Sequence, residues 1–180
     1  MNQYLFTSER LGFRNWTDED LPQLTAINAD PEVMEFFPNV LTQDQSAVFI
    51  QRMKTQFSEN GFCYFAVDRL DTSEFIGFIG LATQTYEAEF TPCVDIGWRL
   101  SAKFWGNGYA TEGARRCLQF GFEEINLPNI KSVCPAINTR SERVMQKIEM
   151  TKVKEFDHSL LTDYPDLERC VLYEMENPSQ

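Results

Sequence analysis

The chain has 180 residues, 43% of them hydrophobic, which is enough for one globular domain with its own core. Sixteen basic residues against 27 acidic residues give a formal net charge of −11. This charge repels nucleic acid and anionic membranes, so we expect neither as a partner, and it favours cationic acceptors such as amines or basic peptides. Acidity that serves only solubility is the alternative explanation.

The five cysteines are odd in number and contain no CxxC pair, and the chain has one histidine. We therefore expect reduced thiols, a cytoplasmic location and no bound metal. No apolar run approaches the roughly 20 residues that a membrane-spanning helix needs. Repeats and linkers are also lacking, so residues 1–180 are expected to form a single domain.

Periodicity predicts mixed helices and strands in a definite order. Helices are expected from about 20 to 30, from 43 to 60, from 110 to 125 and after Thr139. Three capping patterns, Thr17-x-x-Asp20, Thr42-x-x-Gln45 and Thr139-x-x-Glu142, support three of these helix starts. The expected strands are 4–6 with 10–14 (one strand interrupted by a bend), 63–68, 75–83, 93–100, 131–136, 152–156 and 169–175.

The stretch from Cys93 to Thr111 has the build of an anion-binding loop. It begins as an alternating strand whose even-numbered residues are apolar, crosses 101–105, and enters a glycine-containing turn that opens a helix. The first N–H groups of a helix have no carbonyl partner, so a phosphate placed there satisfies them. Gly106 and Gly108 would let the backbone approach such a ligand closely.

Two familiar glycine motifs do not fit this loop. A dinucleotide fingerprint counted from Gly106 would need a glycine or alanine where Thr111 stands, and the Gly-Lys-Ser/Thr of a P-loop is absent. The run WGNGYA, residues 105–110, instead resembles the acetyl-coenzyme A loop of the GNAT superfamily of N-acetyltransferases, Arg/Gln-x-x-Gly-x-Gly/Ala. Trp105 replaces the usual Arg or Gln, which is typical of the RimJ/RimL-type branch of ribosomal-protein N-acetyltransferases.

The resemblance covers essentially the whole chain. It includes R-x-W-x-x-x-D-L at 14–21, D-P-x-V-M at 30–34 and N-x-x-S-x-R-V-x-x-K at 138–147. It implies the GNAT fold, an α/β (α+β) structure whose mixed, mostly antiparallel sheet is splayed between its fourth and fifth strands and flanked by helices. Glu149 departs from the pattern, because the family usually has glycine there, and we expect a different helix end at this point.

The resemblance also implies where acetyl-coenzyme A binds. The residues expected to hold this co-substrate are Gly106, Asn107, Gly108, Tyr109, Ala110 and Thr111 at the diphosphate, Trp98, Arg99 and Leu100 along the pantetheine, and Asn138 and Ser141 near its arm and sulfur. At the pantetheine the strand would offer its edge N–H and C=O groups, as to an added strand. Pro135 supports an open edge here. Proline has no N–H to donate to a ladder, so the strand at 131–136 should be unpaired on one side near its end.

Acyl transfer to an amine needs a base and benefits from an acid at the leaving thiolate. Asp95 is the leading candidate for the base, and its alternative role is a surface ion pair with Arg99. Other candidates are Glu87, Glu89, His158 or water. Ser141 matches the family's position for the acid, with Tyr173 as a weaker candidate.

We therefore expect an acetyl-coenzyme A dependent N-acetyltransferase that works by direct attack in a ternary complex. The acceptor is expected to be a protein N-terminus, such as that of a ribosomal protein, or a small amine. The alternative is an inactive coenzyme A-binding regulatory module. For the oligomeric state, we expect either a monomer or a homodimer.

Overall fold

The computed structural model describes residues 4–179, which form an eight-stranded sheet in the order β1-β2-β3-β4-β5-β6-β8-β7. Every neighbouring pair is antiparallel except β5 and β6, which are parallel. The strands are β1 (Phe6–Thr7), β2 (Leu11–Arg14), β3 (Tyr64–Arg69), β4 (Phe75–Gln84), β5 (Cys93–Leu100), β6 (Asn129–Pro135), β7 (Thr151–Asp157) and β8 (Arg169–Glu176).

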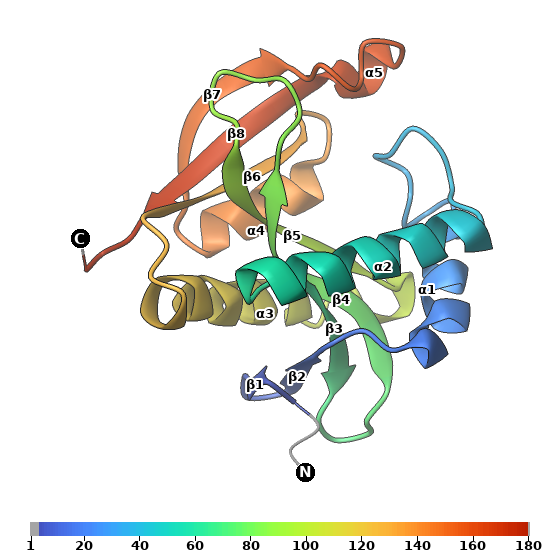
Figure 1. Cartoon of the computed structure of the whole chain (residues 1–180). Helices are drawn as coiled ribbons and strands as arrows, with labels where there is room; N and C mark the ends of the chain where they lie inside the picture. Colours follow the sequence, from blue (N-terminus) through green and yellow to red (C-terminus); the bar gives the residue numbers. More distant parts are fainter. Residues whose placement is uncertain (1–3, 180) are drawn as a thin grey trace.

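Helices lie on both faces of the sheet (Figure 1). They are α1 (Leu21–Asn28), α2 (Gln43–Asn60), α3 (Tyr109–Gln119), α4 (Thr139–Lys147) and the short α5 (Pro165–Glu168), which sequence periodicity did not predict. Helices α1 and α2 pack together on one face, and α3 packs on the opposite face against β4 and β5. The mostly antiparallel α/β architecture expected from the sequence is confirmed.

The two faces of β5 differ as the alternation predicts. Ile96 is paired with Leu81, and Trp98 with Ile79, on the apolar face. This face meets α3 so closely that a Cβ on Gly113 would come within 2.4 Å of Ile79 Cδ1. The polar face of β5 therefore points to α1 and α2.

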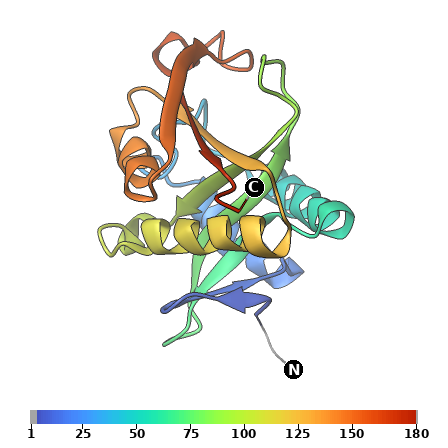
Figure 2. The ribbon, with the colours of Figure 1, turned by 90° about the vertical axis from the view of Figure 1, so that its left-hand side faces the viewer.

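Strands β5 and β6 pair at one position only, Asp95 opposite Lys131, whereas β4 and β5 pair along all eight residues of β5. The Ser132 hydroxyl donates to the Ile96 carbonyl at 3.1 Å just beyond that position. The sheet then splits, and β6, β8 and β7 lean away from the first strands (Figure 2). The expected splay is present here, between the fourth and fifth strands if β1 and β2 count as one interrupted strand.

Helix ends confirm some local predictions and correct others. Thr42 and Gln45 form the expected capping box. The Thr42 N–H donates to Gln45 Oε1 at 2.9 Å, and the Gln45 N–H donates to Thr42 Oγ1 at 3.2 Å. Gly61 ends α2 at φ +77°. The different helix end expected at Glu149 is not found. Glu149 adopts the left-handed φ of +68° that glycine would take, although it carries a Cβ.

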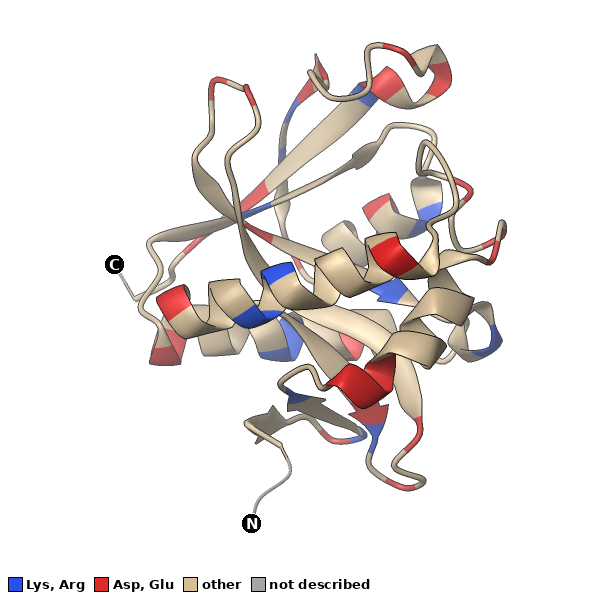
Figure 3. Ribbon diagram, turned by 45° about the vertical axis from the view of Figure 1, so that its right-hand side comes forward, with Lys and Arg blue, Asp and Glu red and all other residues tan. Residues whose placement is uncertain are grey.

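Acidic and basic residues are interspersed along the ribbon (Figure 3). On α2 the basic segments lie in the middle and the acidic segments near the two ends. Within residues 4–179, no helix combines the length and the apolar character needed to cross a membrane. The same part of the chain holds no group of three or more His, Cys, Asp or Glu side chains arranged for a metal ion.

Candidate active site

The turn before α3 is held open by two left-handed glycines. Gly106 has φ +78° and Gly108 has φ +80°, a region that L-residues with a Cβ rarely adopt. The Asn107 side-chain amide donates to the carbonyls of Phe104 and Trp105, at 3.1 Å each. Asn107 thus holds the shape of the turn with its side chain and leaves its own N–H for another partner.

The first N–H groups of α3 are free of intrahelical partners. Gly108 is the N-cap and supplies no side chain, and the ladder begins with the Glu112 N–H to the Gly108 carbonyl at 3.0 Å. The N–H groups of Tyr109, Ala110 and Thr111 therefore have no helical acceptor. A Cβ on Gly106 would meet nothing within 4 Å, so the space above the turn is open. These donors and this space fit an anion of diphosphate size.

The acidic residue in the first turn of α3 does not oppose an anion. The Glu112 carboxylate forms a 2.6 Å ion pair with Arg10 and accepts from the Ser8 hydroxyl at 2.7 Å. Arg10 also lies over the Tyr109 ring, 4.6 Å from its centroid. These contacts hold the pKa of Glu112 below its usual value, although burial opposes them. The helix start is thereby tied to the β1–β2 hairpin.

Only part of the predicted strand edge faces the cleft between β5 and β6. Phe78 is paired with Arg99. Two positions along the ladder, the Ser101 N–H donates to the Ile76 carbonyl at 3.0 Å. Because hydrogen-bonded pairs alternate along an antiparallel ladder, the Arg99 peptide groups also point to β4. The inclusion of Arg99 among the edge groups is therefore wrong. The Leu100 carbonyl points the other way, but it accepts from the Trp105 indole at 2.9 Å. By alternation, the Trp98 peptide groups and the Leu100 N–H face the cleft.

At the start of α4 the structure corrects the predicted cap. Asn138 is the N-cap, and its Oδ1 accepts from the Ser141 N–H at 3.1 Å. The proposed Thr139–Glu142 box is wrong, because the Glu142 carboxylate instead accepts from the Tyr173 hydroxyl at 2.9 Å. Since Asn138 caps through its oxygen and Ser141 is fixed through its N–H, the Ser141 hydroxyl is not used in starting the helix.

On the polar face of β5, Asp95 is bound by two side chains from neighbouring strands. Its Oδ1 accepts from the Tyr64 hydroxyl at 2.6 Å and from Gln84 Nε2 at 3.1 Å. Burial raises the pKa of Asp95 to about 6, although both hydrogen bonds lower it. Burial and the Asp95 charge together raise the pKa of Tyr64. The carboxylate thus stays ionised at neutral pH but is a stronger base than a surface aspartate.

The alternative pairing of Asp95 with Arg99 is not formed. Arg99 Nη1 donates to Asn28 Oδ1 at 2.7 Å, and the guanidinium lies 4.2 Å from the Phe37 centroid and 5.3 Å from that of Phe78. The Arg99 Nε is buried and has no hydrogen-bond partner among the described residues. Arg99 is therefore a partly buried cation that forms no ion pair with a carboxylate of residues 4–179.

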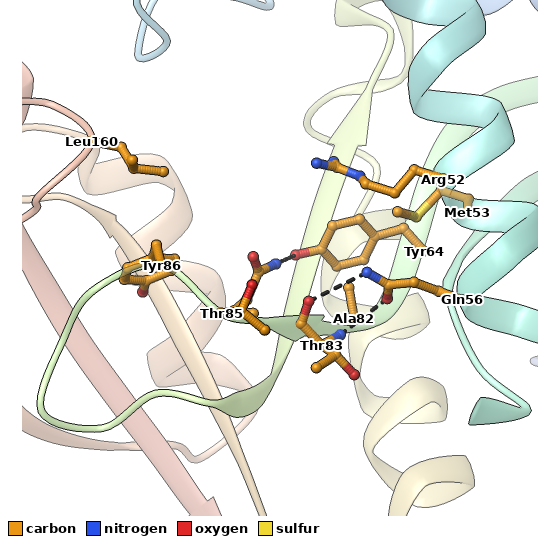
Figure 4. A pocket seen from close by; sticks show the side chains of 10 residues that line it. Arg52, Met53, Gln56, Tyr64, Ala82, Thr83, Thr85, Tyr86 and Leu160 are labelled. Carbon is orange, nitrogen blue, oxygen red and sulfur yellow. Dashed lines mark hydrogen bonds between the residues drawn. The ribbon is translucent and has the colours of Figure 1, made fainter. Parts of the chain in front are cut away.

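A pocket of about 320 Å³ lies beside the Asp95–Tyr64 pair (Figure 4). Its floor is β4, one wall is α2, and the opposite side carries Tyr86 and Leu160. The lining residues are Arg52, Met53, Gln56, Tyr64, Ala82, Thr83, Gln84, Thr85, Tyr86 and Leu160. The Asp95 carboxylate is reached from this pocket through the hydroxyl of Tyr64 and the amide of Gln84.

The other candidate bases have other contacts. Glu89 is exposed and ion-paired with Lys154, and the Glu87 backbone carbonyl accepts from the Ser159 hydroxyl at 2.8 Å. His158 stacks on Tyr86 with ring centroids 4.2 Å apart, and burial lowers its pKa. His158 therefore contacts the pocket-lining Tyr86 through its ring, whereas Asp95 is hydrogen-bonded to the pocket-lining Tyr64.

The cysteines do not provide a nucleophile. All five thiols are free, and burial raises the pKa of Cys93 to about 11 and of Cys134 and Cys170 to about 12. Cys63 and Cys117 are buried with pKa values raised further. A protonated thiol is a weak nucleophile, so acyl transfer through a cysteine is disfavoured at neutral pH.

Sequence reasoning missed Tyr64, Gln84 and Arg52. Tyr64 reaches Asp95 across β4 because Gly97, two strands away, has no side chain, and a Cβ there would stand 3.1 Å from the phenol ring. The backbone of Tyr64 is fixed by Trp16, whose indole donates to the Tyr64 carbonyl at 2.6 Å. The available signals were a tyrosine in a buried strand and a glycine between Asp95 and Arg99.

Comparisons with known proteins agree with this geometry. Residues 10–151 match the family model described as an acetyltransferase (GNAT) domain. An uncharacterised N-acetyltransferase, YnaD of Bacillus subtilis, is 32% identical over 147 residues, which covers 81% of this chain and 82% of that protein.

Solved structures share the fold along nearly the whole chain. A GNAT-family acetyltransferase from Bacillus anthracis superposes with a TM-score of 0.78 at 26% identity and covers 95% of this chain and 97% of its own. RimL, a ribosomal L7/L12 alpha-N-protein acetyltransferase solved with coenzyme A, gives a TM-score of 0.77 at 15% identity, with 98% of this chain and 99% of its own covered. The split sheet, the amide-lined turn and these matches place the chain in the GNAT acetyltransferase family, whose members transfer an acetyl group from acetyl-coenzyme A.

Proposed function

We propose that this N-acetyltransferase binds acetyl-coenzyme A in the cleft between β5 and β6 and transfers the acetyl group directly to a primary amine held on the opposite face of β5. The observation that carries the proposal is the position of Asp95. It stands where β5 and β6 part, and its side chain reaches the acceptor pocket through Tyr64.

On the donor side, backbone groups do the binding. The N–H groups from Gly106 to Thr111 would hold the diphosphate, and the Trp98 and Leu100 groups that face the cleft would pair with the pantetheine amides. Asn138 would contact the same arm through its side-chain amide nitrogen, since its oxygen caps α4. Acetyl-coenzyme A supplies the thioester carbon that accepts the amine.

On the acceptor side, Asp95 takes the proton. An alkylamine such as a lysine side chain has a pKa of about 10.4 and an N-terminal amine a pKa of about 8, so either is mostly protonated at neutral pH and attack requires a base. A carboxylate with a pKa of about 6 is ionised at pH 7 and positioned to accept that proton directly or through the Tyr64 hydroxyl. Tyr64 and Gln84 hold the carboxylate toward the acceptor.

The step balances with two residues. The amine nitrogen forms a bond to the acetyl carbon and the carbon–sulfur bond breaks. A protonated amine loses two protons on the way to the amide: Asp95 takes the first before attack and passes it to solvent, and it then takes the second from the attacking nitrogen. The Ser141 hydroxyl gives a proton to sulfur and regains one from solvent. The Trp98 N–H is the candidate donor to the carbonyl oxygen as negative charge develops on it. The raised thiol pKa values support transfer without a cysteine intermediate.

The acceptor is either a small amine or a protein N-terminus. The name of RimL favours an N-terminal acceptor for that structural neighbour, while the pocket of about 320 Å³ has room for a small molecule or for the first residue of a peptide. Free thiols and the use of acetyl-coenzyme A are consistent with a cytoplasmic enzyme. The enzyme would act as a monomer or a homodimer. No observation favours the inactive regulatory module.

The test is release of free thiol from acetyl-coenzyme A in the presence of a panel of amines and N-terminal peptides, with the acetylated product identified by mass. We expect amine-dependent release that is lost in Asp95→Asn and reduced in Ser141→Ala. Coenzyme A binding without transfer to any acceptor would support the regulatory module instead.

A further inference from the structure

The acceptor pocket carries a positively charged side chain that forms no ion pair within residues 4–179. Arg52 projects from α2 into the pocket beside the Tyr64 ring (Figure 4). Its guanidinium lies 5.5 Å from the Phe49 centroid. Within residues 4–179 it has no carboxylate within ion-pair distance and no hydrogen-bond partner, although the chain is strongly acidic.

A nearby cation on the same helix shows the difference. Lys54, two residues along α2, forms a 2.6 Å ion pair with Asp18 and does not line the pocket. The basic segments in the middle of α2 are visible in Figure 3. An acidic surface has thus supplied a partner for Lys54 and none for Arg52, so Arg52 is left available to an anion from outside.

A second cation lies behind the first. Arg99 is partly buried and binds the neutral Asn28, and its buried Nε has no hydrogen-bond partner among the described residues. Burial is the main cause that lowers the pKa of Arg99, and the charge of Arg52 lowers it further. The two guanidinium groups are therefore close enough to repel each other. An anion near Arg52 would relieve this repulsion and add attraction to Arg99 without touching it.

The remaining lining does not supply negative charge. None of the ten residues around the pocket is Asp or Glu. Asp95, adjacent to the pocket, is hydrogen-bonded by Tyr64 and Gln84. It lies close enough to Arg52 for the arginine charge to lower its pKa, but the two side chains form no ion pair. Gln56 is also occupied, since it accepts from the Thr83 N–H at 3.0 Å and donates to the Thr83 carbonyl at 3.3 Å. Arg52 is therefore the charged donor that a bound acceptor would meet.

Resting on the acetyl transfer proposed above, we infer that the acceptor amine carries a carboxylate, which Arg52 receives while Asp95 takes the amine proton. The carboxylate is either the α-carboxylate of a free amino acid or the acidic side chain of a peptide's first residue. The polyamines and strongly basic peptides that the net charge of −11 would attract are disfavoured inside this pocket.

The test compares acceptors that differ only in the carboxylate. The pairs are phenylalanine with phenethylamine, and Glu-Ala amide with Gln-Ala amide, each assayed by thiol release with acetyl-coenzyme A. A hydrogen-bonded charge pair changes affinity about tenfold or more, so we expect kcat/KM to favour the carboxylate in at least one pair by that factor. Preference in the first pair assigns the α-carboxylate, and preference in the second assigns the acidic side chain.

Arg52→Gln should remove this preference, so that the kcat/KM ratio within the pair approaches one, and Arg52→Lys should keep part of it. The matched control is Lys54→Gln, which removes one charge from the same helix and should leave the ratio as in the wild type. A wild type that turns over both members equally, or an Arg52→Gln variant that keeps the preference, would overturn the inference while leaving acetyl transfer supported.

A binding measurement separates the two proposals. Calorimetric titration of 3-phenylpropionate, which has the carboxylate but no amine, into the coenzyme A complex should show affinity that falls about tenfold in Arg52→Gln and not in Lys54→Gln. If that binding is present but no amine is acetylated, the anion site is supported and the proposed function fails. If amines are acetylated but Arg52→Gln does not weaken binding, the anion site fails.

Discussion

The two sides of β5 are built in different ways. On the donor side, the proposed contacts come from peptide groups, namely the turn at 106–108, the first turn of α3 and the β5 edge that faces β6. On the acceptor side, they come from the side chains of β3, β4, β5 and α2 that surround Asp95. A peptide-built site is insensitive to side-chain identity except at glycine, whereas a side-chain site depends on each residue that contributes to it. The predictions below use that difference.

The largest expected effect is on the acceptor side. Asp95→Asn removes the base but keeps an acceptor oxygen for Tyr64, so we expect kcat/KM to fall by about 10²- to 10⁴-fold. The affinity for acetyl-coenzyme A, measured by calorimetry, should be unchanged because the donor site is built elsewhere. Turnover within threefold of the wild type would remove Asp95 from the mechanism and leave Glu87, Glu89, His158 or water.

On the donor side, the sensitive position is Gly108. Gly108→Ala places a Cβ at φ +80°, which costs about 1–2 kcal/mol, and it distorts the N–H groups that follow, so KM for acetyl-coenzyme A should rise about tenfold. Gly61→Ala is the matched control, because Gly61 has φ +77° at the far end of α2. Both variants should lose similar stability in thermal unfolding, and only Gly108→Ala should change KM. An equal change in both would mean that the effect is one of folding.

At α4 the roles of Ser141 and Asn138 can be separated. Ser141→Ala removes the proposed proton donor but not the cap, so kcat should fall, by about fivefold to tenfold because a thiolate leaves readily without an acid. Asn138→Ala removes the cap oxygen and should lower the free energy of unfolding by about 1 kcal/mol. Unfolding and initial-rate measurements on both variants check this, and an unchanged kcat in Ser141→Ala would exclude the acid role.

The smallest effect is a displacement of the pH profile. Asp95 must be ionised to accept a proton, so wild-type kcat/KM should fall as pH drops through about 6. The Tyr64 hydrogen bond lowers the pKa of Asp95, so Tyr64→Phe should raise that pKa and move the acid limb to higher pH. A profile measured from pH 5 to 9 tests the sign. Movement to lower pH, or none, would contradict the assigned contact.

The difference between the two sides also explains what could be read from the sequence. The donor loop is contiguous and glycine-dependent, so residues 105–111 predicted its conformation, and the Thr42–Gln45 box predicted the start of α2. The acceptor constellation is assembled from segments about 30 residues apart, Tyr64 and Asp95 among them, and their contact depends on register between strands. No local pattern encodes that register.

The errors have the same origin. The Thr139–Glu142 box was predicted from spacing alone, but Glu142 finds the Tyr173 hydroxyl on β8, and Asn138 caps the helix in its place. The family resemblance implied three consecutive residues, 98–100, at the cleft edge, but peptide groups alternate in direction along a strand, and those of Arg99 point to Phe78 on β4. Tertiary partners decided both outcomes.

The most direct test of the central claim is a crystal structure with acetyl-coenzyme A bound. We predict the diphosphate within hydrogen-bond distance of the N–H groups between Gly106 and Thr111, and the pantetheine between β5 and β6 with an amide paired to Trp98. The acetyl group should end near Asp95. Density for the diphosphate away from this turn, or β5 and β6 paired along their length in the complex, would contradict the account.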